Sequence, residues 1–329
     1  MVQRKAGEFE LIERLFQPLA ADAPGAFGLK DDAAMLPPLN HGEGWVVTTD
    51  TMMEGSHWLA GSDGGDVAAK LLRVNLSDLA AMGAMPRFYT LSLALNRETP
   101  ETWTEAFAAR LKDEQSRFGV SLIGGDTVAT SGPIAVTLTA LGSVKRGDEL
   151  HRKGAGAGED VYLTGTIGDA ALGLRILKGE LDGLTDGAKD HLVRRHRTPD
   201  PRTTVGTGLV GIAAACIDIS DGLVQDLGHV AAASGVSIVI KADAVPLSST
   251  TREALNADPA LMETILSGGD DYELAFTASR DGASAIQALS KETGVPISRI
   301  GTVEAGTGVS VRDGEGRDVT PKSGGFQHF

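Results

Sequence analysis

The stretch that decides the fold is Val46-Val47-Thr48-Thr49-Asp50-Thr51-Met52-Met53-Glu54-Gly55-Ser56-His57. The apolar run from Trp45 to Val47 predicts a buried strand, and two hydroxyls and a carboxylate follow it directly. Polar side chains at the end of a strand are a common place for binding and catalytic groups. Thr49 and Asp50 would serve equally well as helix N-caps, so this stretch alone indicates either a cap or a site.

The same arrangement recurs further along the chain. Val120 to Ile123 runs into Gly124-Gly125-Asp126-Thr127, and Ala213 to Ile219 ends in Asp218-Ile219-Ser220-Asp221-Gly222. Near the C-terminus, Gly268-Gly269-Asp270-Asp271-Tyr272-Glu273 leads into a strand that begins at Leu274. Repetition of a carboxylate beside Gly, Ser or Thr at the end of an apolar segment favours a site over a set of helix caps.

A further acid, Asp78, lies on the helix predicted for residues 67 to 82, which is apolar almost all round and therefore buried on more than one side. Asn75 shares its face, because residues three apart are neighbours on a helix. A buried carboxylate needs a partner, and both Arg73 and a metal ion remain candidates.

Composition excludes several classes of partner and of metal site, and it indicates where the protein is located. The chain has 329 residues, 42% of them hydrophobic and 22% charged, and a formal net charge of −14, which argues against nucleic acid or an anionic membrane as partner. Its single cysteine, Cys216, excludes an internal disulfide and any cysteine-based metal cage, and its apolar neighbours predict a buried packing residue. Without a signal-peptide pattern or an 18-residue apolar stretch, we expect a cytoplasmic protein.

Length and element order predict two mixed α/β domains facing one cleft. A segment rich in glycine and charge begins near residue 145, so we place the boundary between residues 1–147 and residues 148–329. Strands are predicted from Arg87 to Leu95 and from Ile134 to Val144, whereas Asp182 to Asp200 is polar and is expected at the surface.

Seven acids at strand ends or on the buried helix could meet in the cleft. They are Asp31, Asp50, Asp78, Asp126, Asp218, Asp221 and Asp270. Mutual repulsion forbids their convergence without neutralisation, and all-oxygen ligands select Mg²⁺ over zinc. Mg²⁺ shared between carboxylates and substrate phosphates makes phosphoryl transfer the simplest chemistry.

Neither a Walker loop nor a dinucleotide-binding glycine motif occurs. The loop from Arg152 to Gly158 could hold an anion through Arg152 and its backbone N–H groups, or could be a flexible linker. A lone His57 is more often structural, but its position beside Asp50 and Glu54 favours a substrate contact.

These motifs together resemble those of the thiamine-monophosphate kinases, within the superfamily that includes aminoimidazole ribonucleotide synthetase. The similarity runs nearly end to end, through eight segments in the family's order. They begin at Gly7, Asp31, Thr48, Asn75, Gly124, Asp218, Gly268 and Gly325.

The resemblance implies transfer of the γ-phosphoryl group of ATP to thiamine monophosphate, with several Mg²⁺ ions, no general base and no covalent enzyme intermediate. It also implies a homodimer built by the N-terminal domains, as a shared sheet or barrel. By position, the implied ATP contacts are Gly125, Asp126, Arg152 and Ser220. The implied contacts to the thiamine substrate are His57, Asp270 and Phe326. The implied Mg²⁺ ligands are Asp31, Thr48, Thr49, Asp50, Asp78, Asp126, Asp218 and Asp221.

Three positions depart from the family pattern. Asp270 stands where the family usually has Glu, Phe326 where it often has Trp, and Leu29-Lys30 where it has Ile-Gly. A shorter acid at position 270 implies a longer or water-bridged substrate contact.

Two rival readings remain. Another ATP-using enzyme of the superfamily is one, although a selenophosphate synthetase or a hydrogenase-maturation protein would carry a reactive cysteine near an end of the chain, and Cys216 is near neither end. A non-catalytic protein that binds divalent metal or nucleotide is the other.

Overall fold

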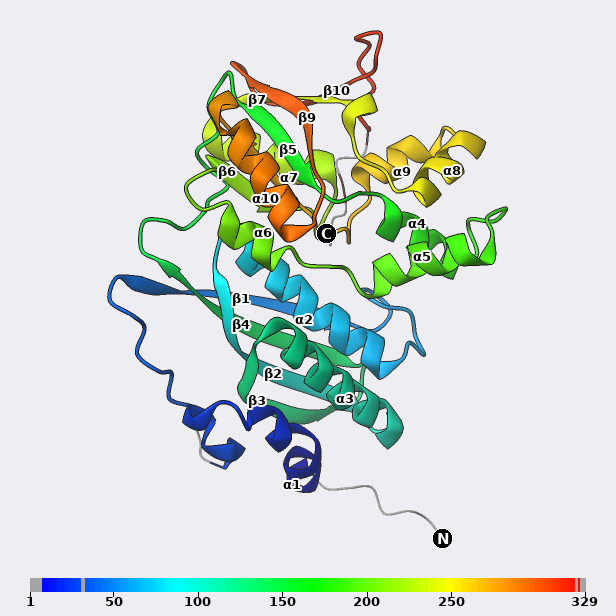
Figure 1. Cartoon of the computed structure of the whole chain (residues 1–329). Helices are drawn as coiled ribbons and strands as arrows, with labels where there is room; N and C mark the ends of the chain where they lie inside the picture. The colour runs from blue at the N-terminus through cyan, green and yellow to red at the C-terminus, as the bar shows by residue number, and fades with distance from the viewer. Residues whose placement is uncertain (1–7, 31–32, 323–324, 326–329) are drawn as a thin grey trace. The chain divides into compact units, whose positions relative to one another are not determined.

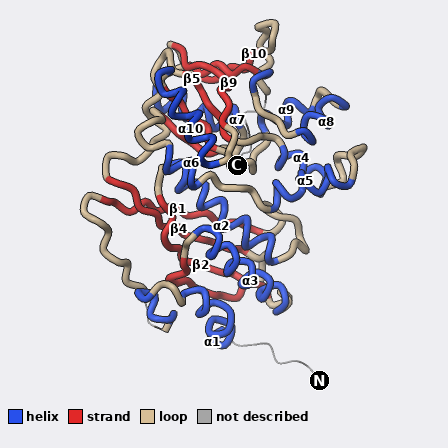
Figure 2. Tube along the Cα trace, in the orientation of Figure 1, coloured by secondary structure: helices blue, strands red, loops and turns tan. Residues whose placement is uncertain are grey.

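The computed structural model describes residues 8–30, 33–322 and 325. The chain divides into two compact units, one formed by residues 1–79 and 85–146 and the other by residues 80–84 and 147–329. Each unit contains a sheet and helices, so the expected two-part mixed α/β class is confirmed (Figures 1 and 2).

The N-terminal unit contains a four-stranded sheet in the order β1-β4-β2-β3. β4 pairs antiparallel with both β1 and β2, while β2 and β3 run parallel, so β1 and β3 are the edge strands. Its strands are β1 (Glu43–Met53), β2 (Met85–Asn96), β3 (Ser121–Thr130) and β4 (Ala135–Lys145), and its long helices are α2 (Gly64–Ala81) and α3 (Glu101–Phe118).

Side-chain hydrogen bonds place both long helices on one face of this sheet. Thr48 of β1 bonds to Asp78 of α2, and Tyr89 of β2 donates to Gln115 of α3 at 2.7 Å. A 2.9 Å bidentate ion pair between Arg73 and Glu114 ties the two helices together. The other face of the sheet has no long helix over it among the residues that the structure describes (Figure 1).

The predicted first helix, Glu8 to Leu19, is helical but irregular. It consists of α1 (Glu8–Leu11), a π-helical turn at Ile12–Phe16 and a 3₁₀ turn at Gln17–Ala20, and a further 3₁₀ segment follows at Pro24–Leu29. Alanines of these turns pack on Ile123 and Leu141. The segment therefore covers one end of the sheet face that the long helices leave open.

The C-terminal unit contains a six-stranded mixed sheet in the order β10-β7-β9-β5-β8-β6. Its central strands β5 and β8 are buried along their whole length, because helices cover both faces. The strands are β5 (Asp160–Thr164), β6 (Ala215–Asp218), β7 (Ser237–Lys241), β8 (Leu274–Ala278), β9 (Ile297–Glu304) and β10 (Gly308–Arg312). The helices are α4 (Asp169–Leu177), α5 (Asp186–Arg197), α6 (Thr203–Gly208), α7 (Leu223–Ser234), α8 (Ser249–Ala257), α9 (Leu261–Ser267) and α10 (Ala283–Thr293).

Two hydrophobic clusters lie on opposite sides of this sheet. Leu223 and Leu227 of α7 pack on one side with Leu163 of β5, while Leu289 of α10 packs on the other with Phe276 of β8. Cys216 lies in the second cluster at 2% exposure, where burial raises the pKa of its thiol far above the usual value. The prediction of a buried, unreactive cysteine is confirmed.

Two strand ends were predicted wrongly. β1 continues through Asp50 to Met53, and β3 continues through Asp126 to Thr130, so both acids lie inside strands. The pattern failed at Asp126 because the sheet has one open face, on which a strand can carry polar residues without ending. It failed at Asp50 because that acid faces another polar side chain, Asp78 of α2, on the helix side of the sheet. Asp218 does end its strand, as expected.

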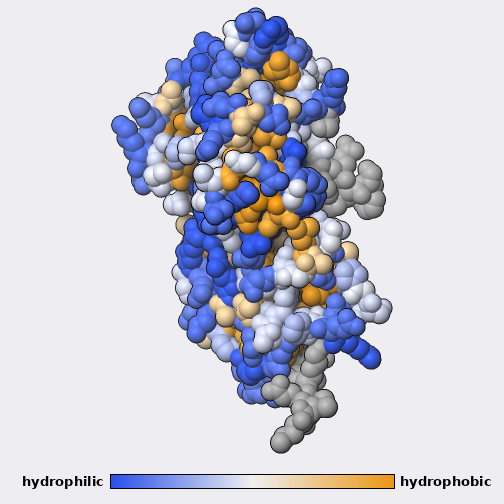
Figure 3. All heavy atoms as spheres, turned by 90° about the vertical axis from the view of Figure 1, so that its right-hand side faces the viewer, coloured by the Kyte–Doolittle hydropathy of each residue, from blue (hydrophilic) through white to orange (hydrophobic). Residues whose placement is uncertain are grey.

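No helix within residues 8–30, 33–322 and 325 is long and apolar enough to cross a membrane. On the side of the chain drawn in Figure 3, hydrophilic residues cover much of the surface and apolar residues gather in patches.

In the C-terminal unit, Gly269 allows its loop to lie against the loop that carries Ser220. A Cβ atom at Gly269 would lie 2.0 Å from the carbonyl oxygen of Ser220, whereas one at Gly228, inside α7, would meet nothing within 4 Å. We therefore expect Gly269→Ala to lower the free energy of unfolding by about 2 kcal/mol or more, through steric overlap. Gly228→Ala is the matched control and should raise it by about 0.5–1 kcal/mol, because alanine favours the helix. Urea unfolding measures both, and equal effects would contradict the close approach of the loops.

Candidate active site

The polar cluster of the N-terminal unit joins β1 to α2. Alternation along β1 turns Thr48 and Asp50 toward the helix side of the sheet, and the Thr48 hydroxyl donates a short hydrogen bond to Asp78. Burial, and then the negative charge of Asp78, raises the pKa of Asp50 to about 7. Two acids and a hydroxyl thus share one partly buried place, as the sequence predicted for Asp50 and Asp78.

Arg73 was the other candidate partner for Asp78. Its guanidinium forms two 2.9 Å hydrogen bonds with Glu114, and both side chains are almost completely buried. Glu114 also accepts a 2.8 Å hydrogen bond from Arg110, so this buried acid holds two guanidinium groups.

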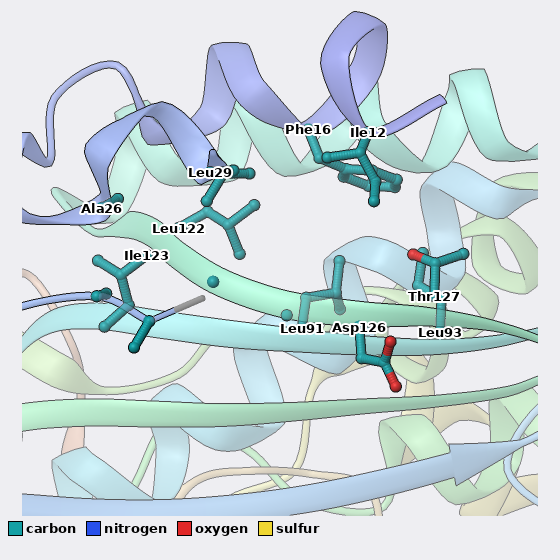
Figure 4. A pocket seen from close by; sticks show the side chains of 14 residues that line it. Ile12, Phe16, Ala26, Leu29, Leu91, Leu93, Leu122, Ile123, Asp126 and Thr127 are labelled. Atoms are coloured by element: carbon teal, nitrogen blue, oxygen red, sulfur yellow. The ribbon is translucent and has the colours of Figure 1, made fainter. Parts of the chain in front are cut away.

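Thr49 and Asp126 have side chains on the opposite face of the sheet. The Thr49 hydroxyl lies 3.0 Å from that of Thr139, and Asp126 pairs across the strands with Ser92. Strand register connects Asp126, through Ser92 and Thr137, to Thr51, the residue after Asp50. Figure 4 shows the carboxylate of Asp126 pointing away from the side to which Leu91 and Thr127 point. One copy of this unit therefore does not bring the side chains of Asp50 and Asp126 together.

A cavity of about 140 Å³ lies at the β3 edge of the same sheet. Ile12, Phe16 and Leu29 of the N-terminal segment form one wall, and the Gly124-Gly125-Asp126-Thr127 stretch lies opposite (Figure 4). An apolar wall with exposed glycine backbone suits a flat aromatic ring.

The C-terminal unit brings two of the sequence motifs into direct contact. Backbone N–H groups of Asp270 and Tyr272 donate to the carbonyl oxygens of Ser220 and Ile219, each at 2.8 Å. The loop that follows β6 is thereby paired with the loop that precedes β8. Of the predicted site residues, Asp218, Ser220, Asp221 and Asp270 lie together here.

Asp226 fixes the backbone of the loop that follows β6, and it was not among the site residues predicted from the sequence. Its Oδ2 accepts N–H groups from Ser220, Asp221 and Gly222 at 3.0, 3.0 and 3.2 Å. Burial raises the pKa of Asp226 to about 7, and the three backbone donors oppose that rise. An acid in the first turn of α7 was the available signal, since such acids cap exposed N–H groups.

His196 was also missed, because residues 182 to 200 were expected at the surface. Within that range α5 buries Arg195 and His196 in its last turn, which corrects the expectation for these two residues. The buried face of α5 could have been predicted from the helical spacing of Ala188, Leu192 and Arg195, but the polar composition of the segment hid this pattern.

The remaining predicted residues lie apart from these clusters or outside the described residues. His57 Nδ1 accepts the backbone N–H of Met53 at 3.0 Å, so the neutral ring carries its proton on Nε2. Arg152 has an exposed side chain in a loop whose backbone is tied to Ser234 by hydrogen bonds of 3.1 and 3.2 Å from Gly154 and Ala155. Asp31 and Phe326 lie outside the described residues.

The donors around Asp50 suit a hard divalent cation, although no three His, Cys, Asp or Glu side chains within residues 8–30, 33–322 and 325 are arranged to hold a metal ion. Burial is the main cause of the raised pKa of Asp50 and the charge of Asp78 adds to it, and carboxylate and hydroxyl oxygens are preferred Mg²⁺ ligands. Thr48, Asp50 and Asp78 could therefore supply part of a magnesium site, completed by waters and substrate phosphates.

Comparison with known proteins identifies the class. Residues 30–144 match the model of the AIR synthase related protein N-terminal domain, and residues 156–314 match that of the C-terminal domain. Hydrogenase maturation protein HypE in complex with ATP shares the fold, with a TM-score of 0.79 at 19% identity over 98% of this chain and 96% of that one. Fold and site together define a two-domain protein of the AIR synthase related class.

Closer relatives define the family. Thiamine-monophosphate kinase of Caulobacter vibrioides is 41% identical over 98% of this chain and 90% of its own, and that of Escherichia coli K12 is 40% identical over 98% of each. The crystal structure of the Stenotrophomonas maltophilia K279a enzyme has a TM-score of 0.84 and 41% identity, covering 93% of this chain and 96% of that one. The structure of AaThiL complexed with AMPPCP and TMP has a TM-score of 0.76 and 30% identity, covering 100% of this chain and 100% of that one. The chain belongs to the thiamine-monophosphate kinase family.

Removing one carboxylate charge from the Asp50–Asp78 pair should show whether the pair binds Mg²⁺, apart from its effect on folding stability. A carboxylate whose pKa is raised from 3.8 to about 7 binds more protons in the folded state, so it makes stability fall as pH rises from about 4 to 7. We expect Asp78→Asn to flatten this fall and to abolish the rise in Tm that Mg²⁺ produces at pH 8. Asp113→Asn, an exposed acid on α3, should change neither. An unchanged Mg²⁺ response in Asp78→Asn would place the cation elsewhere.

Proposed function

We propose that the protein transfers the γ-phosphoryl group of ATP to the phosphate of thiamine monophosphate, giving ADP and thiamine diphosphate. The observation that carries the proposal is the partly buried Asp50–Asp78 pair, in a chain about 40% identical to thiamine-monophosphate kinases over nearly its full length. One P–O bond to ADP breaks, and one P–O–P linkage to the acceptor forms.

ATP would bind through Gly125, Asp126, Arg152 and Ser220. The apolar cavity beside Gly125 would take the base, because it offers apolar walls and open backbone. Arg152 would hold phosphate by charge.

Mg²⁺ would be held by Asp31, Thr48, Thr49, Asp50, Asp78, Asp126, Asp218 and Asp221. When bound, the ions neutralise the phosphates and stabilise the charge of the transferring group. Thr49 would contribute its backbone oxygen or act on the open face, since its side chain points away from Asp50.

The thiamine substrate would contact His57, Asp270 and Phe326. The Nε2–H of His57 would donate a hydrogen bond, because its Nδ1 is already an acceptor. Asp270 would accept N–H groups or face the positive charge of the substrate.

No general base is required, since the attacking phosphate oxygen is already ionised at neutral pH. The side chains of this site bind, align and neutralise the two substrates, and positioning with electrostatic stabilisation supplies the rate. We therefore assign no catalytic residue in the acid–base sense.

Purified protein should release ADP only when thiamine monophosphate is present, and thiamine diphosphate should form in equal amount. Unphosphorylated thiamine should be a poor acceptor, because its hydroxyl would have to lose a proton without a base. Phosphorus NMR with coupled ADP detection measures both products. ADP release that ignores the acceptor, or binding of ATP without turnover, would favour the rival readings.

We also propose a homodimer formed by the N-terminal unit, in the cytoplasm where ATP is available, with residues 1–147 as the ATP, Mg²⁺ and dimerisation domain and residues 148–329 closing the active-site cleft. The sheet face away from α2 and α3 carries exposed Val47, Met53 and Val128. A second copy on this face would bury these side chains, and would cover the unpaired edges of β1 and β3.

The placement of Asp126 supports a shared site. Its carboxylate lies on the face opposite that of Asp50, and on the edge strand farthest from β1 in the sheet. If β3 of one copy meets β1 of the other, Asp126 of one subunit serves the cation that Asp50 of the other holds.

Mixed dimers test this sharing. Asp50→Asn and Asp126→Asn should each be inactive, and co-expressed together they should recover about one quarter of wild-type activity, because half of randomly paired dimers contain both variants and each of these has one intact site. Asp50→Asn paired with Asp78→Asn is the control and should recover nothing, since both acids belong to one face of one chain. Light scattering should give a dimer mass. Recovery no greater than in the control would assign Asp50 and Asp126 to a single chain.

A further inference from the structure

Asp270 has a strained backbone that the C-terminal unit holds in place. Its φ is +69° and that of Tyr272 is +52°, the left-handed region that residues other than glycine seldom adopt. Two 2.8 Å hydrogen bonds to the loop after β6 keep this conformation. Such strain persists where the surroundings fix it, and it concentrates at functional sites.

The carboxylate of Asp270 has a neighbour at each oxygen. The hydroxyl of Tyr272 donates to Oδ1 at 3.3 Å, and Nδ1 of His196 lies 3.3 Å from Oδ2. Asp270 is 30% exposed on its side chain and His196 only 6%. The carboxylate therefore lies against a buried imidazole at one oxygen and a tyrosine hydroxyl at the other, and part of its surface remains exposed.

His196 cannot easily move away from this position. Its chain neighbour Arg195 bonds to Glu273 at 2.9 Å, and Arg202 bonds to the same carboxylate at 2.6 Å. Glu273 begins the segment that continues into β8, three residues after Asp270. The last turn of α5 and the Asp270 loop are thus anchored to one buried acid.

We infer that His196 is a positioning residue that aims the Asp270 carboxylate at the substrate and sets the affinity for its organic part. The inference rests on the proposed function, in which Asp270 contacts thiamine monophosphate. Each carboxylate oxygen accepts more than one hydrogen bond, so the oxygens that lie beside Nδ1 of His196 and the Tyr272 hydroxyl can still accept from the amino group of a pyrimidine or face a cationic ring. Both the amino group and the positive ring are present in thiamine.

Two substitutions at position 196 separate positioning from packing. An Asn amide can place N–H near the position of Nδ1, whereas a Gln amide reaches toward that of Nε2, away from Asp270. We expect His196→Gln to raise KM for thiamine monophosphate about tenfold, with kcat and KM for ATP nearly unchanged, and His196→Asn to restore KM to within about threefold of wild type. His191→Gln, on the same helix beside Asp169, is the control and should leave KM unchanged.

Coupling to Asp270 is the second readout. In an Asp270→Asn background, His196→Gln should cause no further rise in KM, because the contact it disrupts is already lost. In ¹⁵N-histidine-labelled wild-type protein, thiamine monophosphate should shift the His196 Nδ1 resonance and a non-hydrolysable ATP analogue should not. The shift should disappear in Asp270→Asn, a comparison that needs no folded His196 variant.

The outcomes distinguish the two proposals. Absence of acceptor-dependent ADP release in the wild type would overturn the proposed function. Wild-type turnover with additive KM effects of His196→Gln and Asp270→Asn, or with equal losses for both substrates, would overturn the positioning role alone.

Discussion

Two carboxylates that are partly removed from water cannot both stay ionised beside each other without a balancing charge, and the N-terminal unit depends on this constraint. Asp50 and Asp78 meet across β1 and α2, and burial, with the charge of Asp78 added to it, raises the pKa of Asp50 to about 7. Arg73, a cation on the same helix as Asp78, forms two hydrogen bonds with Glu114. A site built in this way is poorly stable when empty at neutral pH, and it gains most from a divalent cation.

In the C-terminal unit, backbone N–H groups face a buried acid. Oδ2 of Asp226 accepts three N–H groups from the loop that carries Ser220 and Asp221, which fixes that loop, while burial raises the pKa of Asp226 to about 7. Glu273 takes two guanidinium groups, and it anchors the segment that carries Asp270. These two buried acids fix the loops, which leaves Asp221 and Asp270 partly exposed for ligands.

Much of this could be predicted from the sequence, and the failures have physical causes. Motif order and apolar runs predicted the two mixed α/β units, α7 from Leu223 to Ser234, and the buried cysteine. Strand ends at Asp50 and Asp126 were wrong, because a polar residue inside a strand looks like its end: Asp126 lies on the open sheet face, and Asp50 faces Asp78 of α2. His196 and Arg195 were hidden in a polar segment, since partners 70 or more residues away neutralise them and local pattern contains no trace of such partners.

The scattering of the acids follows from the need to fold before any ligand binds. Seven carboxylates in one pocket would repel one another in the empty protein, and of those that lie within the described residues, Asp50 and Asp78 are held close on one face of the N-terminal sheet. Asp126 is carried on the opposite face of that sheet, and Asp218 and Asp221 belong to the other unit. Each element can therefore form on its own at modest electrostatic cost. In the proposed function, cations and phosphates would supply the attraction that offsets repulsion between the acids that bind them.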